Sequence, residues 1–255
     1  MTRSPSEAAK KLKGFSMLEA RELSKSFNGV VALDGLNVEV QEGEILCFLG
    51  ANGAGKTTAI NLFLGFLEPT RGEALVKGKS VRSDPVSARE HVAYIPERVA
   101  LYPDLSGYEN LRFFAELAGK RLGESELLEC LDTAGLPRDA NHKLASTYSK
   151  GMQQKVGIAC ALAKSAEVLL LDEPLAGLDP KAANEFCSLL REMRHQGVAG
   201  LMATHDLFRA REVASRIGIL RDGQLVDVIA AADVTAAQLE TLYLEHMHEG
   251  REDAA

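Results

Sequence analysis

The segment GANGAGKT, Gly50 to Thr57, restricts the fold of this 255-residue chain more than any other part of its sequence. It matches the pattern G-x-x-x-x-G-K-[ST], with the apolar run EILCFL before it and the helix-like segment KTTAINLFLGFL after it. Glycine adopts the backbone conformations that let several N–H groups converge on one anion, and a following helix adds the positive end of its dipole. The segment therefore predicts a phosphate-binding loop between a buried strand and a helix.

Side chains at the end of this loop are expected to bind a nucleotide and its metal ion. In this pattern Lys56 reaches the β- and γ-phosphates, and the Thr57 hydroxyl ligates Mg²⁺. The predicted nucleotide-binding residues of the loop are Gly50, Asn52, Gly53, Ala54, Gly55, Lys56, Thr57 and Thr58.

Two carboxylates follow a second apolar run, VLLLDEP, which has the length of a fully buried parallel strand. Asp172 can hold Mg²⁺ through its water shell, and Glu173 can orient and polarise an attacking water. His205 follows a further apolar run, GLMAT, where its side chain can contact a γ-phosphate. Taken alone, each of these residues would fit an ordinary solvated loop. Beside a phosphate-binding loop they predict phosphoryl transfer, with Lys56, Glu173 and His205 as candidate catalytic residues.

Strands and helices alternate in the second half of the chain, which is typical of a parallel α/β core. The first part instead has short strand-like runs separated by turn signals such as Asn28-Gly29, which predict an antiparallel hairpin layer. Helical periodicity dominates the middle, where Ser106 and Glu109 form a predicted capping box. The predicted fold class is α/β: a P-loop NTPase core with a parallel sheet, an antiparallel β layer and an inserted helical subdomain.

The predicted domain organisation follows from the same pattern. Residues 1–16 are polar and charged and are expected to form a flexible tail, so that Met17 could be the natural start of translation. Residues 17–230 form the nucleotide-binding domain, with a helical lobe over about 87–163. Residues 231–255 form a C-terminal helix and an acidic tail.

Composition argues against several other classes of protein. The chain has 29 Lys and Arg against 36 Asp and Glu, a net charge of -7, which disfavours nucleic acid as the main partner. Its four cysteines lack C-x-x-C spacing and fit a reduced, cytoplasmic protein. The N-terminus lacks the apolar core of a signal peptide, and no run reaches the roughly 18 apolar residues of a membrane-spanning helix.

The segment TYSKGMQQKVGIACALA resembles the L-S-G-G-Q signature of the ATP-binding subunits of ABC transporters, and the resemblance extends over residues 18–223. Ser149 and Gly151 open a helix whose N-terminus can offer N–H groups and dipole to a phosphate, although a simple helix cap by Ser149 would also fit locally. In this family the signature completes an ATP site on the opposite subunit. The resemblance therefore implies ATP and Mg²⁺ as cofactors and a homodimer or heterodimer of ATP-binding subunits.

The resemblance also implies roles for single residues. Phe27 stands at the position of the aromatic residue that stacks on adenine, although packing within the hairpin would explain it equally well. Glu173 matches the catalytic base and His205 the switch histidine, and AGLD with Asp179 matches the loop that links the two sites. The predicted nucleotide-binding set is completed by Phe27, Ser149, Gly151, Gln153 and Asp179.

The chain departs from the usual family pattern at two charged positions. Glu97 stands where the family usually has a glutamine that ligates Mg²⁺ and senses the membrane partner. A carboxylate can also approach the metal, so the predicted metal ligands are Thr57, Glu97 and Asp172. Lys150 replaces a glycine of the signature and makes the start of that helix more basic.

The stretches YIPE, LYPDLSGYENLRFF and YSKGM resemble the ATPases that pair with export permeases of the ABC-2 class. This implies a subunit on the inner face of the cell membrane that binds and hydrolyses ATP and powers a polytopic permease by dimer closure. Leu101 and Tyr102 are expected to be partly exposed and to contact that permease, and burial in the core of the lobe is the alternative.

The sequence also fits a second function, that of a soluble ABC ATPase in an assembly process such as iron–sulfur cluster biogenesis. The partner distinguishes the two functions, because only the transporter subunit binds a membrane permease. A translation or DNA-repair ATPase of the same superfamily would be expected to have two nucleotide domains or a long coiled coil. A non-catalytic binding module would be expected to lack Lys56, Glu173 or His205, and all three are present.

Overall fold

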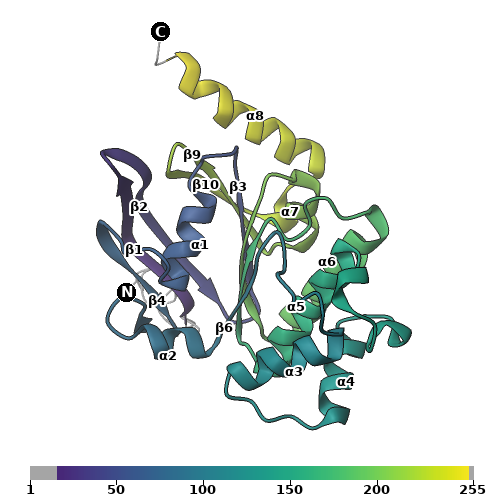
Figure 1. Ribbon diagram of the computed structural model, residues 1–255. Coiled ribbons are helices and arrows are strands. Elements are labelled where there is room, and N and C mark those ends of the chain that lie inside the picture. Colours follow the sequence, from purple (N-terminus) through teal and green to yellow (C-terminus); the bar gives the residue numbers. More distant parts are fainter. Residues whose placement is uncertain (1–15, 253–255) are drawn as a thin grey trace, which may run out of the picture.

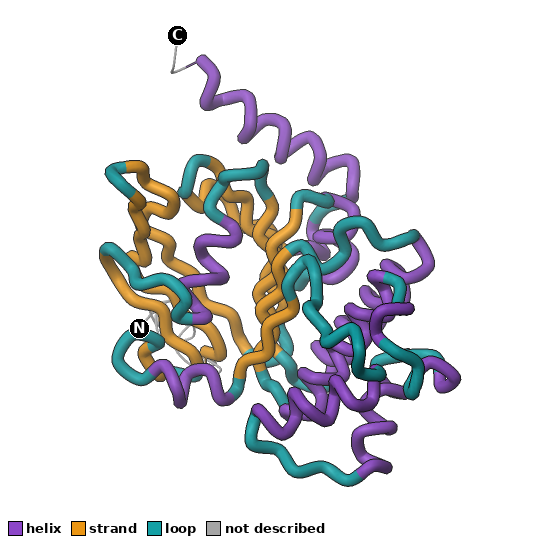
Figure 2. Tube along the Cα trace, viewed as in Figure 1, coloured by secondary structure: helices purple, strands orange, loops and turns teal. Residues whose placement is uncertain are grey.

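The computed structural model describes residues 16–252, which form a six-stranded sheet, a four-stranded sheet and eight α-helices (Figures 1 and 2). Of the tail predicted over residues 1–16, only Ser16 lies within the described residues, where it begins a strand. Residues 253–255 of the predicted acidic tail also lie outside them. Among the described residues, no helix combines the length and hydropathy that crossing a bilayer requires.

The larger sheet carries the residues of the candidate site. All its neighbouring strands are parallel except the two that come last in the chain, β9 (Arg216–Arg221) and β10 (Gln224–Ala230), which form an antiparallel hairpin at one edge. The apolar runs predicted as buried strands lie at its centre, where they are covered on both faces. The predicted parallel α/β core is confirmed. In spatial order the strands are β10 (Gln224–Ala230), β9 (Arg216–Arg221), β3 (Ile45–Leu49), β8 (Ala199–Thr204), β7 (Val168–Asp172) and β6 (Val92–Ile95).

The smaller sheet is antiparallel, as the turn signals predicted. Its first two strands are joined at Asn28 and Gly29, whose φ angles of 49° and 86° suit the mirror-image turn of a tight hairpin. In spatial order its strands are β2 (Val30–Gln41), β1 (Ser16–Phe27), β4 (Arg71–Val76) and β5 (Lys79–Ser80).

Helix α1 (Lys56–Leu64) lies between the two sheets and joins them into one core (Figure 1). Alternate residues of β3 face opposite sides of the larger sheet. Leu46 and Phe48 pack in the cluster that contains Ile60 and Phe63 of α1, whereas Cys47 packs in the cluster on the other side. The strand is therefore buried on both faces, and this packing fixes the position of its carboxyl end, where the phosphate-binding loop begins.

The other face of the larger sheet is covered by helices (Figures 1 and 2). The capping box at the start of α3 is confirmed, because the Ser106 Oγ accepts from the Glu109 N–H and the Glu109 carboxylate accepts from the Ser106 N–H. The predicted domain boundaries stay a prediction. Helix α2 (Pro85–Glu90) lies on the side of α1, because its Ala88 packs in the same cluster as Ile60 and Phe63. The helices with buried residues in the other cluster are α3 (Gly107–Leu117), α4 (Glu124–Thr133), α5 (Lys150–Lys164), α6 (Pro180–His195), α7 (Leu207–Val213) and α8 (Ala236–Glu252).

A buried tyrosine ties the start of α3 to the segment before α5. The Tyr148 hydroxyl donates to the Ala140 carbonyl at 2.7 Å and accepts from the Gly107 N–H at 3.0 Å. A Cβ atom at Gly107 would lie 2.3 Å from the same hydroxyl, so that position has no room for a side chain. This contact fixes how the chain approaches α5, whose first turn carries part of the candidate site.

We expect Tyr148→Phe to lower the free energy of unfolding by about 1–3 kcal/mol, because it leaves a buried carbonyl and a buried N–H without a partner. Urea denaturation measures the change. Tyr108→Phe is the matched control in the same lobe, since the hydroxyl of Tyr108 makes no hydrogen bond within residues 16–252. Equal losses of stability in the two variants would contradict the assigned role of Tyr148.

Candidate functional site

The phosphate-binding loop predicted at Gly50 to Thr57 connects β3 to α1. Glycine is required there by close backbone approaches. A Cβ atom at Gly50 would lie 2.4 Å from the Leu220 carbonyl oxygen, and one at Gly55, where φ is 103°, would lie 2.6 Å from the Ala32 carbonyl oxygen. Gly53 also has a positive φ, of 87°, with open space around it. The loop thus has the backbone conformation of an anion cradle at a helix N-terminus.

Lys56 is the first residue of α1, and only 6% of its surface is exposed. Its ammonium donates to the carbonyl oxygens of Gly50 at 2.6 Å and Ala51 at 3.0 Å. It also lies 3.9 Å from Glu173 Oε1. Burial lowers the pKa of Lys56, and the charges of Glu173 and Asp172 oppose that change. A buried cation is thus held across the loop, beside two acids.

Thr57 and Asp172 meet although they are far apart in the sequence. The Thr57 hydroxyl donates to Asp172 Oδ1 at 3.0 Å. Burial raises the pKa of Asp172, the hydrogen bond from Thr57 opposes this, and the charge of Glu173 adds to it. A hydroxyl and a carboxylate are the oxygen ligands that Mg²⁺ prefers. Mg²⁺ therefore fits this pair, with phosphate oxygens and water left to complete its coordination.

Glu173 lies between the ends of β7 and β8. Its φ of 47° is unusual for a residue other than glycine, and its N–H donates to the Ala203 carbonyl at 2.9 Å. Its carboxylate accepts from the Thr204 hydroxyl at 3.1 Å and lies 3.0 Å from Nδ1 of His205. Sequence reasoning missed Thr204, and its place directly before His205 was the only signal available. The backbone and both carboxylate oxygens of Glu173 are therefore held in place.

These groups form one site at the carboxyl ends of β3, β7 and β8. A backbone anion cradle, a buried ammonium and a hydroxyl–carboxylate pair lie beside a carboxylate that is held at both oxygens. This set can bind a nucleoside triphosphate with Mg²⁺ and can direct a water molecule at its terminal phosphate.

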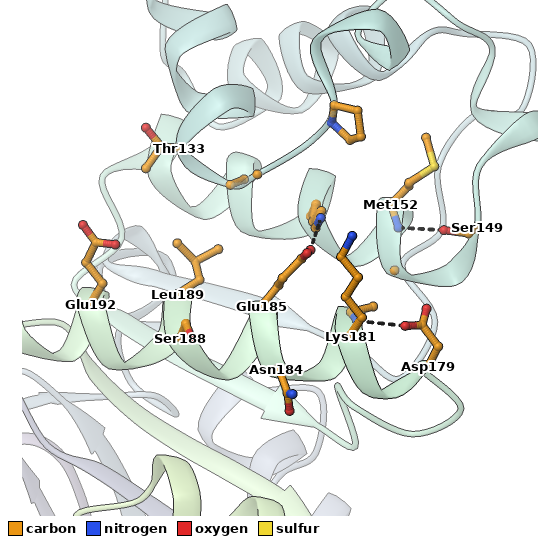
Figure 3. A pocket seen from close by; sticks show the side chains of 16 residues that line it. Thr133, Ser149, Met152, Asp179, Lys181, Asn184, Glu185, Ser188, Leu189 and Glu192 are labelled. Carbon is orange, nitrogen blue, oxygen red and sulfur yellow. Dashed lines mark hydrogen bonds and ion pairs between the residues drawn. The ribbon is translucent and has the colours of Figure 1, made fainter.

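The predicted signature residues lie with Asp179 of the predicted AGLD loop at a second place, where the N-termini of α5 and α6 meet. Ser149 Oγ accepts from the Met152 N–H at 3.3 Å, and Asp179 Oδ1 accepts from the Ala182 N–H at 3.0 Å. Figure 3 shows these two caps at one end of a pocket of about 780 Å³ between α5 and α6, which Gly151 also lines. Within residues 16–252, no hydrogen bond or ion pair joins this group to the phosphate-binding loop.

Phe27 lies apart from both groups, whereas Gln153 belongs to the second, because its N–H donates to the Ser149 carbonyl at 3.0 Å. Phe27 ends β1 beside the Asn28 turn and is 42% exposed, with the Lys25 ammonium 5.0 Å from the centre of its ring. Gln153 lies in the first turn of α5 and is half-buried. An exposed aromatic face is available to stack on a planar base.

Glu97 pairs with Lys150 rather than with the hydroxyl–carboxylate pair, at 3.3 Å between Oε1 and Nζ. The backbone beside it is held by Gln154, which sequence reasoning missed. The Gln154 amide donates to the Pro96 carbonyl at 3.1 Å and to the Glu97 carbonyl at 3.0 Å. A fully buried glutamine within a helix has no local sequence signal. The metal-ligand role of Glu97 stays a prediction.

Comparison with known sequences identifies relatives over most of the chain. A model of the ABC transporter family matches residues 33–176, more than half of the chain. An uncharacterised ABC transporter ATP-binding protein of Bacillus subtilis, YhcH, is 35% identical over 90% of this chain and 75% of its own length. The bacitracin transport ATP-binding protein BcrA of Enterococcus faecalis is 33% identical over 86% of this chain and 70% of its own length. The chain spans only 37% of the probable multidrug ATP-binding protein YbhF of Escherichia coli, with 36% identity over 84% of this chain.

Solved structures agree with the sequence relatives. The ATP-binding subunit of an ABC transporter superposes with a TM-score of 0.79 and 31% identity, covering 90% of this chain and 99% of that one. A dimeric ATP-binding cassette in a post-hydrolysis state, bound to ADP and Pi, has a TM-score of 0.76 and 27% identity, and the match covers 84% of this chain and 99% of that one.

We expect Asp172→Asn to increase the free energy of unfolding of the nucleotide-free protein at pH 8. The folded pKa of Asp172 is raised above its ordinary value of 3.8, so the carboxylate destabilises the fold above that folded pKa. The penalty falls as the pH decreases and is absent below the ordinary value. Urea denaturation at pH 8 and pH 5 measures the difference, with the exposed Asp104→Asn as the control. A lower free energy of unfolding for Asp172→Asn at pH 8 would contradict the conclusion that the Asp172 carboxylate destabilises the fold.

Proposed function

This chain belongs to the ABC transporter family of ATP-binding proteins, and from that premise we propose a role for each residue of its site. The protein is an ATP-binding subunit of an ABC transporter, with ATPase activity. The observation that carries the proposal is the convergence of the Thr57–Asp172 pair and the Glu173–His205 pair at one edge of the sheet.

The phosphate-binding loop holds the triphosphate of ATP. The backbone N–H groups of Gly53 to Thr58 surround the phosphates, and Lys56 turns its ammonium from the loop carbonyls to the β- and γ-phosphates. Phe27 stacks on the adenine. Thr57 and Asp172 would hold Mg²⁺, which would supply positive charge to stabilise the phosphates.

Glu173 orients the attacking water and accepts a proton from it. Its hydrogen bond from Thr204 leaves the other carboxylate oxygen directed toward His205, so the carboxylate has a defined face for the water. His205 is 60% exposed, so it is free to contact the γ-phosphate. Catalysis then rests on positioning and on charge stabilisation by Lys56 and the metal.

ATP-binding subunits of this family form dimers and pair with membrane permease components. In our proposal Ser149, Gly151, Gln153 and Asp179 face the nucleotide of the second subunit. The first turn of α5 presents free N–H groups and the positive end of a dipole, which suit a phosphate. The pocket of about 780 Å³ beside Ser149 and Gly151 leaves this helix start accessible.

The permease is proposed to dock at the groove between β6 and α5. This groove of about 260 Å³ is lined by Phe66, Tyr94 and Phe114. Beside it Tyr102 is 50% exposed, and Leu101 is half-buried and packs against the core of the lobe. The relatives include proteins for bacitracin transport and linearmycin resistance, which supports an exporter on the inner face of the membrane.

We expect Glu173→Gln to lower ATP turnover by roughly 10²–10⁴-fold, because the amide cannot accept the proton of the attacking water. Nucleotide binding should be kept and the ATP-bound dimer prolonged. Phosphate release and nucleotide titration measure the two effects separately. Glu129→Gln, on the exposed face of α4, is the control. Unchanged turnover in Glu173→Gln would refute the role of this residue.

We also expect a polytopic membrane protein to copurify with the tagged chain from detergent-solubilised native membranes. Tyr102→Ser should reduce its recovery, because an exposed aromatic side chain at the groove is lost. Leu244→Ser removes a comparably exposed apolar side chain, of α8, and should not. Mass spectrometry with and without ATP identifies the partner. Recovery of soluble proteins alone would favour the assembly-factor function and remove support for transport.

A further inference from the structure

The two charged residues at which this chain departs from its family pattern meet in the structure. The Lys150 ammonium lies 3.3 Å from Glu97 Oε1, although the two residues are 53 positions apart. The side chains are 26% and 59% exposed, respectively, so the pair is open to water on one side. The Lys150 ammonium is also close to the loop before α6, 3.7 Å from where a Cβ of Gly177 would lie. One lysine therefore pairs with one segment that flanks the candidate site and lies near another.

Helix α5 holds the segment 96–99 at successive turns of one face. Lys150 binds the Glu97 carboxylate, and one turn later Gln154 donates to the backbone carbonyls of Pro96 and Glu97. A further turn on, Gly157 leaves room for Val99. A Cβ atom at position 157 would lie 3.0 Å from Val99 Cγ2, which is too close for ordinary packing. Positions spaced by three and four residues lie on one face of a helix. Segment 96–99 is therefore attached to α5 along its first two turns.

The pair also resolves an electrostatic problem at the start of α5. Lys150 is the first residue of this helix, where a cation is disfavoured by the positive end of the dipole. The Glu97 carboxylate offsets that repulsion and draws the ammonium toward segment 96–99. Without it, the ammonium would no longer be held toward segment 96–99 and would be free to move at the start of the helix, next to the groups proposed to receive a phosphate.

We infer that Glu97 and Lys150 form a positioning pair that sets the start of α5 for association with a second, ATP-bound chain. The inference rests on the proposed role of Ser149 and Gly151 at the dimer contact. ATP binding to the single chain uses the loop at Lys56 and does not require the pair. Association of two chains requires both charges together, so the loss of either one has the same consequence as the loss of both.

A double-mutant cycle on ATP-dependent dimerisation tests this inference. The parent is the full chain with Glu173→Gln, and Glu97→Gln, Lys150→Gln and their combination are added to it. Analytical ultracentrifugation with ATP and Mg²⁺ gives the dimer dissociation constant, and titration with a fluorescent ATP analogue gives binding to the single chain. Each single substitution should weaken dimerisation by about five- to tenfold, with the combination no weaker than either alone. Measured without Mg²⁺, so that the predicted metal contact of Glu97 does not enter, analogue affinity should stay within about twofold.

Two further variants separate the effect of the Glu97–Lys150 pair from the general effect of removing a surface charge. The exchanged pair, Glu97→Lys with Lys150→Glu, should recover most of the association because the attraction is restored. Lys143→Gln removes a comparably close ion pair with Asp139 on the lobe surface, 2.6 Å long, and should leave dimerisation unchanged.

The outcomes distinguish this inference from the proposed function. Additive losses in the cycle, or unchanged dimerisation in the single variants, would overturn the positioning pair while leaving the ATPase proposal intact. A parent that stays monomeric with ATP, or that fails to bind the analogue, would overturn the proposed dimer mechanism and this inference with it.

Discussion

The parallel register of β3, β8 and β7 is the constraint on which the candidate site depends. Leu49 pairs with Thr204 and Asp172 pairs with Ala203, so these strands end at one edge of the sheet. The phosphate loop, the two acids and the histidine each follow one of these strands and meet without a further supporting element. A slip of one residue in β7 would exchange its two faces and turn Asp172 away from Thr57.

Much of the site could be predicted because its signals are local. The turn at Asn28-Gly29, the capping box at Ser106 and the glycines of the phosphate loop each depend on a few adjacent residues, and the structure contains all of them. The contacts of Thr204 and Gln154 could not be predicted, since their partners lie 31 and at least 57 positions away. Such pairs exist only after the strands and α5 have packed.

Helix α5 connects regions that the sequence presents as separate motifs. It begins at the Ser149 cap, its first two turns hold segment 96–99, and Gly157 and Cys160 line the groove proposed for the permease. The same helix packs against α3, α4 and α6 and against β6. In the proposed function, a permease that shifts α5 at the groove would also move the start of this helix, because α5 is continuous between the two places.

The electrostatics of the nucleotide-free site favour ligand binding over stability. Lys56 is buried with its ammonium held by loop carbonyls, and burial opposes its charge. Asp172 is likewise penalised by burial, and the nearby charge of Glu173 increases that penalty. In the proposed function a metal ion would relieve the penalty on the acids, and phosphate oxygens would satisfy the ammonium. In that proposal, binding energy is gained from charges that the fold already holds in place at a cost, and the metal contact of Asp172 would offset what its carboxylate costs the nucleotide-free fold.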